Sequence, residues 1–393
     1  MNFNQISFVI FSLLYSLYGS PTTSKIGVVE VAMIILIIAS INITNFVEFI
    51  QNNYKDKLLI FFSIVLIYGF FISMYQANSL NKVLRDFIFY GYMGYFFLML
   101  FLIERSKFDL KVVLFFLIIT GVFFLIRSYY TSISLHYDFT NLVIDKRYLI
   151  INISILFVST LLPLILIKFF LKKKVDRVFI FIFSIIFIYA YLFFSTKLAI
   201  RSSLLVFFGL SLYLIVYLYR KKYLNDEYQK NNIVNKIGIT IMVILISFIL
   251  YNLELTEIFF KLKSNFFNNR LFEFRAAYEN LVSPFDIIFG KGVGSLILSK
   301  STNGYTNFVH NFFLHFYYKH GIIGLIFSII LMYKISIRIY FNIINLNPIA
   351  IAGFFPFIYA LMLSTSYKTL EFWMLVIVMI ISEKRKFYVH KNN

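Results

Sequence analysis

Three groups of polar residues in the second half of the sequence have types and spacings that suit chemistry. Arg201 lies between two strongly apolar runs, and Arg270 and Arg275 lie close together. His310 and Asn311 stand where a further apolar run begins. A guanidinium binds phosphate oxygens through two parallel hydrogen bonds, and an imidazole accepts a proton near neutral pH. We therefore expect binding of a phosphate-bearing substrate and activation of a hydroxyl group.

Each arginine also has a plain structural explanation. A lone arginine such as Arg201 can reach the lipid headgroups and anchor a helix end. If the segment around Arg270 is helical, Glu273 follows three residues later and could pair with it. Arg270 and Arg275 would then line the solvated face of a surface helix. The sequence alone leaves both explanations open for these residues.

Alternating glycines follow the arginines, at Gly290, Gly292 and Gly294. Such glycines permit tight turns and close approach of a ligand to the backbone, so Gly292 and Gly294 are candidate substrate contacts. They are not a dinucleotide fingerprint, because no βαβ pattern surrounds them. His310 alone could be a structural histidine bonded to a backbone carbonyl, and His315 and His320 are expected at the membrane interface.

Several common catalytic patterns are missing from the sequence. Cysteine is absent, which excludes disulfides, thiolate metal sites and a cysteine nucleophile. The histidines lack metal-ligand spacing, and there is neither a Walker loop nor a G-x-S-x-G elbow. We therefore expect chemistry that uses no metal and no cofactor.

The elements that must position these residues are membrane-spanning helices. Hydrophobic residues make up 60% of the 393-residue chain and charged residues only 14%, which excludes a soluble enzyme, a disordered chain and a secreted disulfide scaffold. We expect an all-α polytopic membrane protein with about 12 transmembrane helices. The predicted spans are 6–19, 27–45, 58–75, 86–103, 112–127, 148–170, 178–194, 202–219, 237–252, 312–333, 347–366 and 370–382.

The net charge of +19 comes from basic residues in short loops between the apolar runs. In a soluble protein this charge would suggest nucleic acid, but here it matches the lysine and arginine excess of cytoplasmic loops. We predict no nucleic-acid partner and place both termini on the cytoplasmic side. Charged residues near the hydrocarbon layer are costly and count as functional candidates. In the outward half they also include Glu30, Arg85, Asp86, Arg127 and Lys197.

One connection is long enough to fold outside the membrane. Residues 253–311 alternate aromatic and charged residues, which is typical of short amphipathic helices at a membrane surface. We expect this external loop to belong to a single integral membrane domain covering residues 1–393. Its six basic and five acidic residues nearly cancel, so anion binding would depend on particular side chains.

In their combination and order, these features resemble the O-antigen polymerase and O-antigen ligase superfamily of bacterial membrane glycosyltransferases. The matching residues, within about 190–335, are Arg201 to Leu205, then Arg270, Phe274 and Ala277, then Gly290, Gly292 and Gly294, and finally His310, Asn311, Leu314, Gly321 and Gly324. Two positions depart from the family pattern. Ile200 stands where serine often precedes the arginine, so Lys197 is an alternative to Arg201. Phe274 stands where tryptophan is common.

The resemblance implies an enzyme at the outer face of the bacterial cytoplasmic (inner) membrane. Its substrates would be oligosaccharides on undecaprenyl diphosphate, joined into O-antigen or capsular polysaccharide by metal-independent, inverting glycosyl transfer. Arg201 and Arg270 would bind the diphosphate, with Arg275 as a further candidate. His310 would activate the acceptor hydroxyl, and Asn311 would help to hold that geometry. The expected partners are the bilayer, a chain-length regulator and a flippase.

Two other functions fit the same sequence. An O-antigen ligase, which transfers glycan to another acceptor, would share these motifs and differ only in that acceptor. A polysaccharide flippase or transporter would be expected to show internal repeats and charges at the middle of the bilayer, and neither is evident. The concentration of candidate polar residues at one face favours chemistry over transport.

Overall fold

The computed structural model describes residues 3–18, 28–134, 152–171, 267–299, 304–306, 309–364 and 366–381. Across these residues the protein is helical apart from one two-stranded hairpin. Four described helices are long and apolar enough to cross a membrane: Lys57–Tyr75, Leu80–Glu104, Leu110–Arg127 and Phe312–Ile344. They correspond to the predicted spans 58–75, 86–103, 112–127 and 312–333. The predicted spans 178–194, 202–219 and 237–252 lie outside the described residues.

The N-terminal helices largely follow the apolar runs. They are α1 (Phe3–Tyr18), α2 (Val28–Ala39), α3 (Ile43–Asn53), α4 (Lys57–Tyr75), α5 (Leu80–Glu104), α6 (Leu110–Ser134) and α8 (Ile153–Leu171). The prediction of one span over 27–45 is wrong, because α2 ends at Ala39 and a separate helix α3 follows. Asn42 begins α3 by accepting a hydrogen bond from Thr44 N at 3.2 Å. Asparagine is favoured there because its side-chain oxygen satisfies an N–H that a helix start leaves unpaired.

The C-terminal part contains the loop elements and a buried helix. The elements are α13 (Phe267–Asn280), α14 (Pro284–Phe289), antiparallel strands β1 (Ile297–Ser299) and β2 (Gly304–Thr306), α15 (Phe312–Ile344), α16 (Pro348–Leu363), the 3₁₀ helix η3 (Ser366–Lys368) and α17 (Leu370–Ile381). The described part of the loop over 253–311 contains two short helices and the hairpin, and its place outside the membrane stays a prediction. α17 is buried along its whole length against α5, α6, α8, α15 and α16. An apolar helix of this kind needs neighbours on every side, so α17 is the centre of the bundle.

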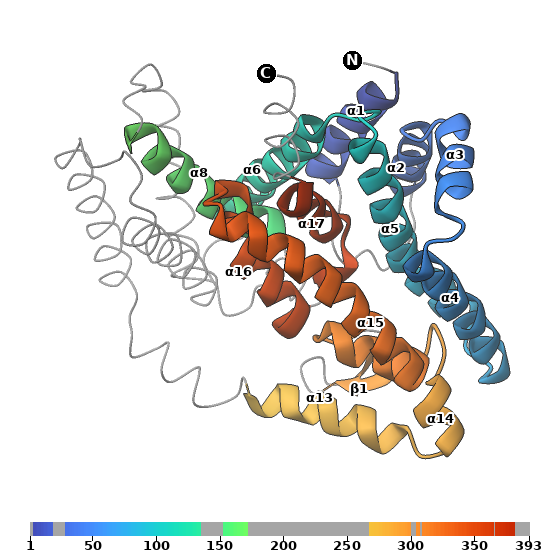
Figure 1. Ribbon diagram of the computed structural model, residues 1–393. Coiled ribbons are helices and arrows are strands. Elements are labelled where there is room, and N and C mark those ends of the chain that lie inside the picture. Colours follow the sequence, from blue (N-terminus) through green and yellow to red (C-terminus); the bar gives the residue numbers. More distant parts are fainter. Residues whose placement is uncertain are drawn as a thin grey trace.

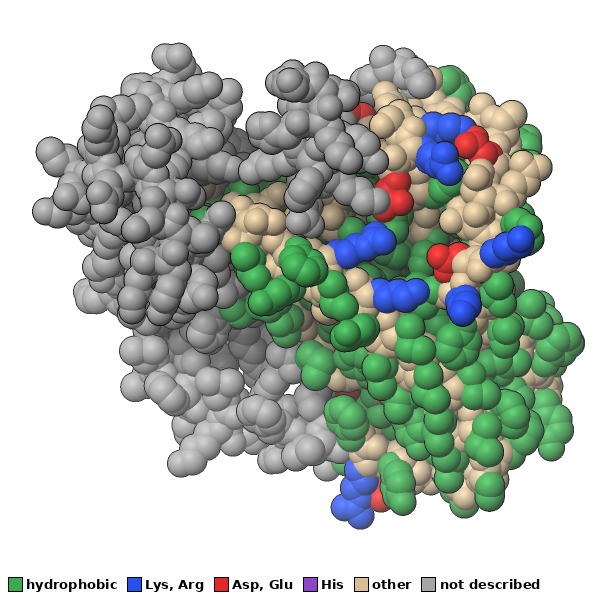
Figure 2. Space-filling view, in the orientation of Figure 1, with side chains coloured by type: hydrophobic (Ala, Val, Ile, Leu, Met, Phe, Trp, Pro, Cys, Tyr) green, Lys and Arg blue, Asp and Glu red, His purple; other side chains and the backbone are tan. Residues whose placement is uncertain are grey.

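The outer surface of the bundle is largely apolar. On α4, Ile60, Ile64, Ile67 and Phe71 project outward, each at least 42% exposed. Figure 2 shows a broad area of hydrophobic side chains bounded on one side by a band of lysine, arginine, aspartate and glutamate. Apolar surface of this extent is costly in water and favourable against lipid. The surface and the long apolar helices are consistent with a membrane protein.

The bundle has two ends, at the bottom and the top of Figure 1. At the bottom, α4 ends, and α5 and α15 begin, beside α13, α14 and the hairpin; we call this the loop end. At the top, α1 begins and α17 ends; we call this the termini end. The loop end therefore brings together segments that are far apart in the sequence.

α15 is interrupted at Gly321, whose φ of 64° and ψ of −157° are not helical. The break releases backbone carbonyls of the preceding turn from their helical partners. They accept hydrogen bonds from other elements instead: Tyr318 O from Lys291 N (2.9 Å), Lys319 O from Gly292 N (2.9 Å), and His320 O from the Tyr68 hydroxyl (2.6 Å). Broken helices are tolerated inside a membrane where the protein satisfies the freed groups in this way. The glycine-rich segment after α14 therefore caps the broken helix.

Candidate functional site

The best-organised candidate catalytic groups are His310 and Glu273. His310 Nδ1 lies 2.7 Å from Glu273 Oε1, and the backbone N–H of His310 donates to Glu273 Oε2 at 3.2 Å. Both residues are buried, at 6% and 2% exposure. One carboxylate thus fixes both the position and the orientation of the imidazole. A carboxylate at Nδ1 holds the proton on that nitrogen, which leaves Nε2 as the lone-pair nitrogen of the neutral ring.

Small side chains on α13 allow Glu273 to reach His310. Ala276 and Ala277 lie on the buried side of α13, in an apolar cluster with Val309 and Leu314. An alanine occupies little volume, so α13 approaches the start of α15 closely. The cluster therefore sets the distance between the helix that carries Glu273 and the segment that carries His310.

The start of α15 is held in place from two directions. Asn311 is the N-cap residue of α15, and its Oδ1 accepts a hydrogen bond from Leu314 N at 2.9 Å. The Tyr367 hydroxyl donates to the carbonyl of Val309 at 2.5 Å. Because these contacts flank His310 on both sides, its backbone has little freedom to move. Asn311 thus holds the geometry of His310 through the helix cap.

A second buried cluster at the loop end surrounds Asp86. Asp86 Oδ2 lies 2.9 Å from Lys319 Nζ, and Oδ1 lies 3.5 Å from Lys368 Nζ. Gly294 N donates to the same carboxylate at 2.8 Å, and Lys319 also donates to the carbonyl of Ser295. Burial lowers the pKa of Lys368 to about 8, against the opposing attraction of Asp86. Two lysines facing one carboxylate give the cluster an excess of positive charge when all three are ionised.

Tyr367 lies between the two clusters. Burial raises the pKa of its hydroxyl, and the negative charges of Asp86 and Glu273 raise it further. One side chain is therefore within electrostatic reach of both carboxylates. The His310–Glu273 pair and the Asp86 cluster belong to one polar region at the loop end.

His315 and His320 are completely buried within the protein, and their expected position at the membrane interface stays a prediction. Both rings, in the first turns of α15, contact aromatic side chains of α5. The Tyr90 hydroxyl lies 2.5 Å from His320 Nε2. The His315 ring packs against the rings of Phe89 and Tyr367, with centroids 5.5 and 5.7 Å apart.

A third buried carboxylate, Glu371, lies at the start of α17. It accepts a hydrogen bond from the Tyr15 hydroxyl at 2.9 Å and another from Asn152 Nδ2 at 2.8 Å. A buried carboxylate is stable where donors satisfy its oxygens. Since these donors come from α1 and from the residue preceding α8, Glu371 ties three helices together, and we assign it a structural role.

The predicted catalytic residues are described to different extents. His310 is at the centre of the site. Arg270 lies in α13, one turn before Glu273, and its side chain is outside the described part of the structure. Arg201 and its alternative Lys197 also lie outside the described residues. The meeting of two guanidinium groups with His310 therefore stays a prediction.

The other predicted contacts have structural partners of their own. The Arg275 side chain is 77% exposed and pairs with Glu279 at 2.6 Å, as expected for a solvated helix face. Gly292 and Gly294 have φ values of 76° and 81°. A Cβ on either would lie within 3 Å of the backbone of α4 or α5, so both glycines allow close packing of the protein on itself. Their contact with a substrate stays a prediction.

Sequence reasoning missed Lys319 and Lys368 and gave Asp86 no partner. A usable signal was present, because Lys319 falls within the predicted span 312–333 and Lys368 lies between two predicted spans. Charged residues in such positions are costly unless they are paired, and they often mark a functional site. Glu371, at the start of a predicted span, carries the same signal.

In chemical terms, the site is a buried base oriented by a carboxylate, next to a cluster with excess positive charge. The base suits removal of a proton from a hydroxyl, and the cations suit an anionic group. Within the described ranges, no group of three or more histidine, aspartate or glutamate side chains is arranged to hold a metal ion. No family model, curated protein or solved structure matches the chain.

Proposed function

We propose that this protein is a membrane glycosyltransferase that polymerises oligosaccharide repeat units carried on undecaprenyl diphosphate, for O-antigen or capsule. The observation that carries the proposal is the buried His310–Glu273 pair on the loop segment. A histidine oriented by a carboxylate is suited to take a proton from a weakly acidic sugar hydroxyl. Positive charge nearby suits a diphosphate leaving group.

In the proposed reaction, His310 Nε2 takes the proton of an acceptor hydroxyl while its oxygen attacks the anomeric carbon of the donor glycan. The bond from that carbon to the lipid diphosphate breaks, and the diphosphate leaves with the electron pair, so the configuration inverts. Glu273 stabilises the imidazolium that forms. Arg270, one turn before Glu273, and Arg201 are the proposed ligands of the diphosphate oxygens.

The distribution of charge supports a loop end that faces away from the cytoplasm. At the termini end, Lys55 lies in the turn before α4 and Lys57 is the first residue of α4, while Arg105 and Lys107 lie in the turn before α6. At the loop end, the turn between α4 and α5, residues 76–79, contains no charged residue. Basic turns favour the cytoplasmic side. The proposed site would therefore be accessible to substrates that have already crossed the membrane.

The test is polymerisation by the purified protein supplied with lipid-linked repeat units alone. General base catalysis contributes about 10²- to 10⁴-fold, so we expect His310→Ala to lower the turnover number by that order. Glu273→Gln keeps the shape of the side chain and removes its charge. We expect it to lower the turnover number with little change in KM, because the carboxylate acts on the protonated histidine of the transition state.

A matched control is His390→Ala, which removes a histidine from the C-terminal tail. It should leave product lengths unchanged in the same assay. Normal chain-length ladders from His310→Ala and Glu273→Gln, at wild-type protein levels in a producing host, would reject the proposed catalytic pair.

The same system separates the three candidate functions. A deletion strain that makes single-repeat product has lost a polymerase, whereas lipid-linked polymer that never reaches its acceptor indicates a lost ligase. Movement of lipid-linked sugar across vesicles by the purified protein, without glycan joining, would indicate a transporter instead.

A further inference from the structure

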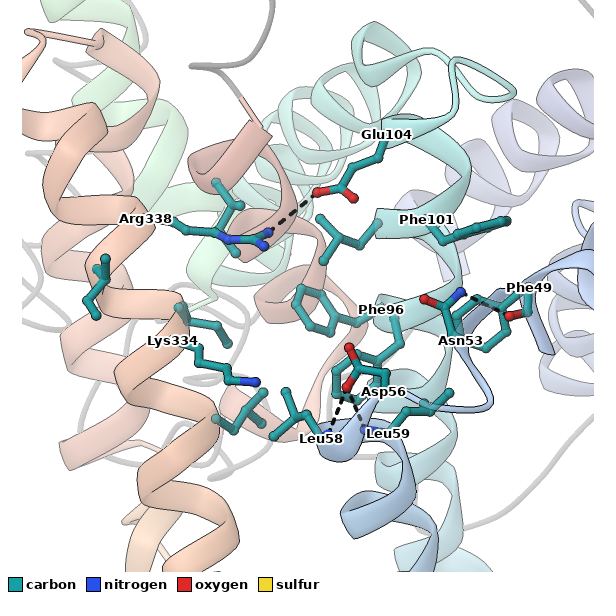
Figure 3. Close-up of a pocket in the computed structure, with 16 residues that line it drawn as sticks. Phe49, Asn53, Asp56, Leu58, Leu59, Phe96, Phe101, Glu104, Lys334 and Arg338 are labelled. Atoms are coloured by element: carbon teal, nitrogen blue, oxygen red, sulfur yellow. Dashed lines mark hydrogen bonds and ion pairs between the residues drawn. The ribbon is translucent and has the colours of Figure 1, made fainter. Parts of the chain in front are cut away.

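A separate cavity of about 420 Å³ opens at the termini end of the bundle. It lies between α3, the start of α4, the last turns of α5, the second half of α15 and the end of α17 (Figure 3). Ligand pockets in proteins commonly span about 300–1,000 Å³, so this volume is sufficient to hold part of a lipid or another small molecule. It is independent of the polar region at the loop end, and its interpretation does not rest on the proposed function.

The walls of the cavity are apolar. Aromatic and aliphatic side chains from facing helices form most of its lining; they include Phe49, Phe96, Phe101, Leu331 and Ile335. Such walls suit a hydrocarbon chain, because transfer of a chain from water to an apolar surface is favourable at every methylene. A fully polar ligand would leave this lining unused.

Four charged residues line the same cavity, two of each sign. Lys334 and Arg338 come from α15, and Asp56 and Glu104 come from the start of α4 and the end of α5. In Figure 3 the amino group of Lys334 points toward the cavity, on the side opposite Asp56. The cations thus lie along one side and the carboxylates along the other, with no net charge.

The contacts of Arg338 and Asp56 leave both side chains able to bind a ligand. Arg338 Nη1 lies 3.5 Å from Glu104 Oε1, a long contact between two partly exposed side chains. Asp56 Oδ1 accepts hydrogen bonds from Leu58 N at 2.7 Å and Leu59 N at 3.1 Å. A carboxylate has about four acceptor positions, so Asp56 can cap α4 and still accept a hydrogen bond from a ligand cation.

We propose that this cavity binds one molecule of a zwitterionic phospholipid with a primary ammonium headgroup, of the phosphatidylethanolamine class. The phosphate bonds to Lys334 and Arg338, the ammonium bonds to Asp56 and Glu104, and an acyl chain lies along the apolar walls. A headgroup with both charges matches a cavity with both charges. Phosphatidylglycerol lacks the cation, and the quaternary ammonium of phosphatidylcholine has no N–H to donate.

The experiment is native mass spectrometry of the full-length protein after delipidation in detergent and re-addition of the three phospholipids in equal amounts. We expect phosphatidylethanolamine to be retained in about two- to fivefold excess over each of the others. This ratio corresponds to the free energy that about one exposed ion pair contributes. Asp56→Asn should reduce the preference over phosphatidylglycerol, because Glu104 is then the one carboxylate left for the ammonium. Asparagine caps helices as well as aspartate does, so this variant removes the charge and keeps α4 intact.

Two further variants complete the design. Lys334→Gln should lower the retention of phosphatidylethanolamine and phosphatidylglycerol alike, because both carry the phosphate. Asp109→Asn is the matched control for Asp56→Asn: Asp109 Oδ1 accepts a hydrogen bond from Lys111 N at the start of α6, outside the cavity. It should leave the lipid ratio unchanged. Equal retention of all three lipids, or a preference for phosphatidylethanolamine over phosphatidylglycerol that is undiminished in Asp56→Asn, would overturn the proposal.

Discussion

The two ends of the bundle differ in how far their charged side chains are buried. At the loop end, Asp86, Glu273 and Lys319 are at most 2% exposed, and their partners lie far away in the sequence. At the termini end, the pairs Lys107–Glu48 and Arg338–Glu104 have side chains that are 30–48% exposed. Among the described residues, the buried ion pairs lie at the loop end, although the Arg275–Glu279 pair on α13 is exposed there, and the pairs at the termini end are partly exposed.

This difference indicates that the loop end bears the energetic cost of burying charged side chains for a purpose other than stability. Removing a charge from water costs several kcal/mol, and pairing often does no more than offset that cost. Exposed pairs cost little and contribute about 0–1 kcal/mol. Basic residues at the termini end fit the proposed cytoplasmic orientation of that end, whereas buried charges within a membrane domain usually mark a functional site.

The largest expected effect comes from removing the carboxylate that two lysines share. Asp86→Asn leaves the buried Lys319 beside a neutral amide and removes the carboxylate that faces Lys368, so we expect a loss of about 3–5 kcal/mol in the free energy of unfolding. Lys319→Met should cost less, because Asp86 keeps Lys368 and the N–H of Gly294. Lys107→Met at the termini end should cost at most about 1 kcal/mol. Denaturant unfolding in detergent measures all three.

The order of these three losses is the informative result. Equal losses for Asp86→Asn and Lys107→Met would show that burial makes no difference between the ends. A larger loss for Lys319→Met than for Asp86→Asn would contradict the view that Asp86 neutralises both lysines.

Four of the 12 predicted spans coincide with long apolar helices of the described structure, and the interruptions of the helices were predicted less well. α4, α5, α6 and α15 coincide with apolar runs because lipid-facing and buried positions both require hydrophobic side chains. The break in α15 at Gly321 was not predicted, since it depends on donors that residues 291 and 292 supply from another segment. Hydropathy indicates whether a segment lies in an apolar environment. It does not identify the hydrogen-bond partners of the backbone groups in that segment.

The candidate site shows the same limit. His310 was identified because its chemistry and its place at the start of an apolar run are visible in the sequence. Its partner was not, because the i, i+3 rule offers Arg270 for Glu273, and the bond between Glu273 and His310 joins residues 37 positions apart. The contact between Asp86 and Lys368 spans 282 positions. Such pairs are products of the fold and have no local sequence pattern.

A variant with a smaller expected effect tests whether the stability of the loop end depends on close backbone packing as well as on charge. Gly294 has a φ of 81°, and a Cβ there would lie 2.7 Å from Val83 N. We expect Gly294→Ala to destabilise the protein by about 1–3 kcal/mol, from the left-handed conformation and the clash. Gly91, in the middle of α5, has no atom within 4 Å of its Cβ position. Gly91→Ala should stabilise by up to about 1 kcal/mol, because alanine favours helix.

Thermal unfolding of both variants in the same detergent provides the comparison. The shifts in Tm should have opposite signs. If Gly294→Ala unfolds at the wild-type temperature, the glycine-rich segment does not pack against α5 as described, and the N–H that Gly294 donates to Asp86 loses its support.

The smallest effect concerns a loop-end carboxylate whose partner remains accessible. Asp286 Oδ2 lies 2.6 Å from Lys291 Nζ, and the Lys291 side chain is 24% exposed. Burial raises the pKa of Asp286, but hydrogen bonds from Lys291 and Ser283 outweigh it and hold the net pKa below its usual value. A carboxyl group whose pKa is lower in the folded protein than in the unfolded chain stabilises the fold. This stabilisation is fully present above the pKa of the unfolded chain, about 3.9, and is lost as the pH falls through the pKa of the folded protein. We expect Asp286→Asn to remove this dependence of the free energy of unfolding on acid pH, which amounts to at most about 1 kcal/mol. The wild type and Asp286→Asn should have the same free energy of unfolding at the lowest pH.

A difference in the free energy of unfolding that instead grows as the pH falls would mean that the protonated aspartate is the stabilising form, so that Lys291 is not its effective partner.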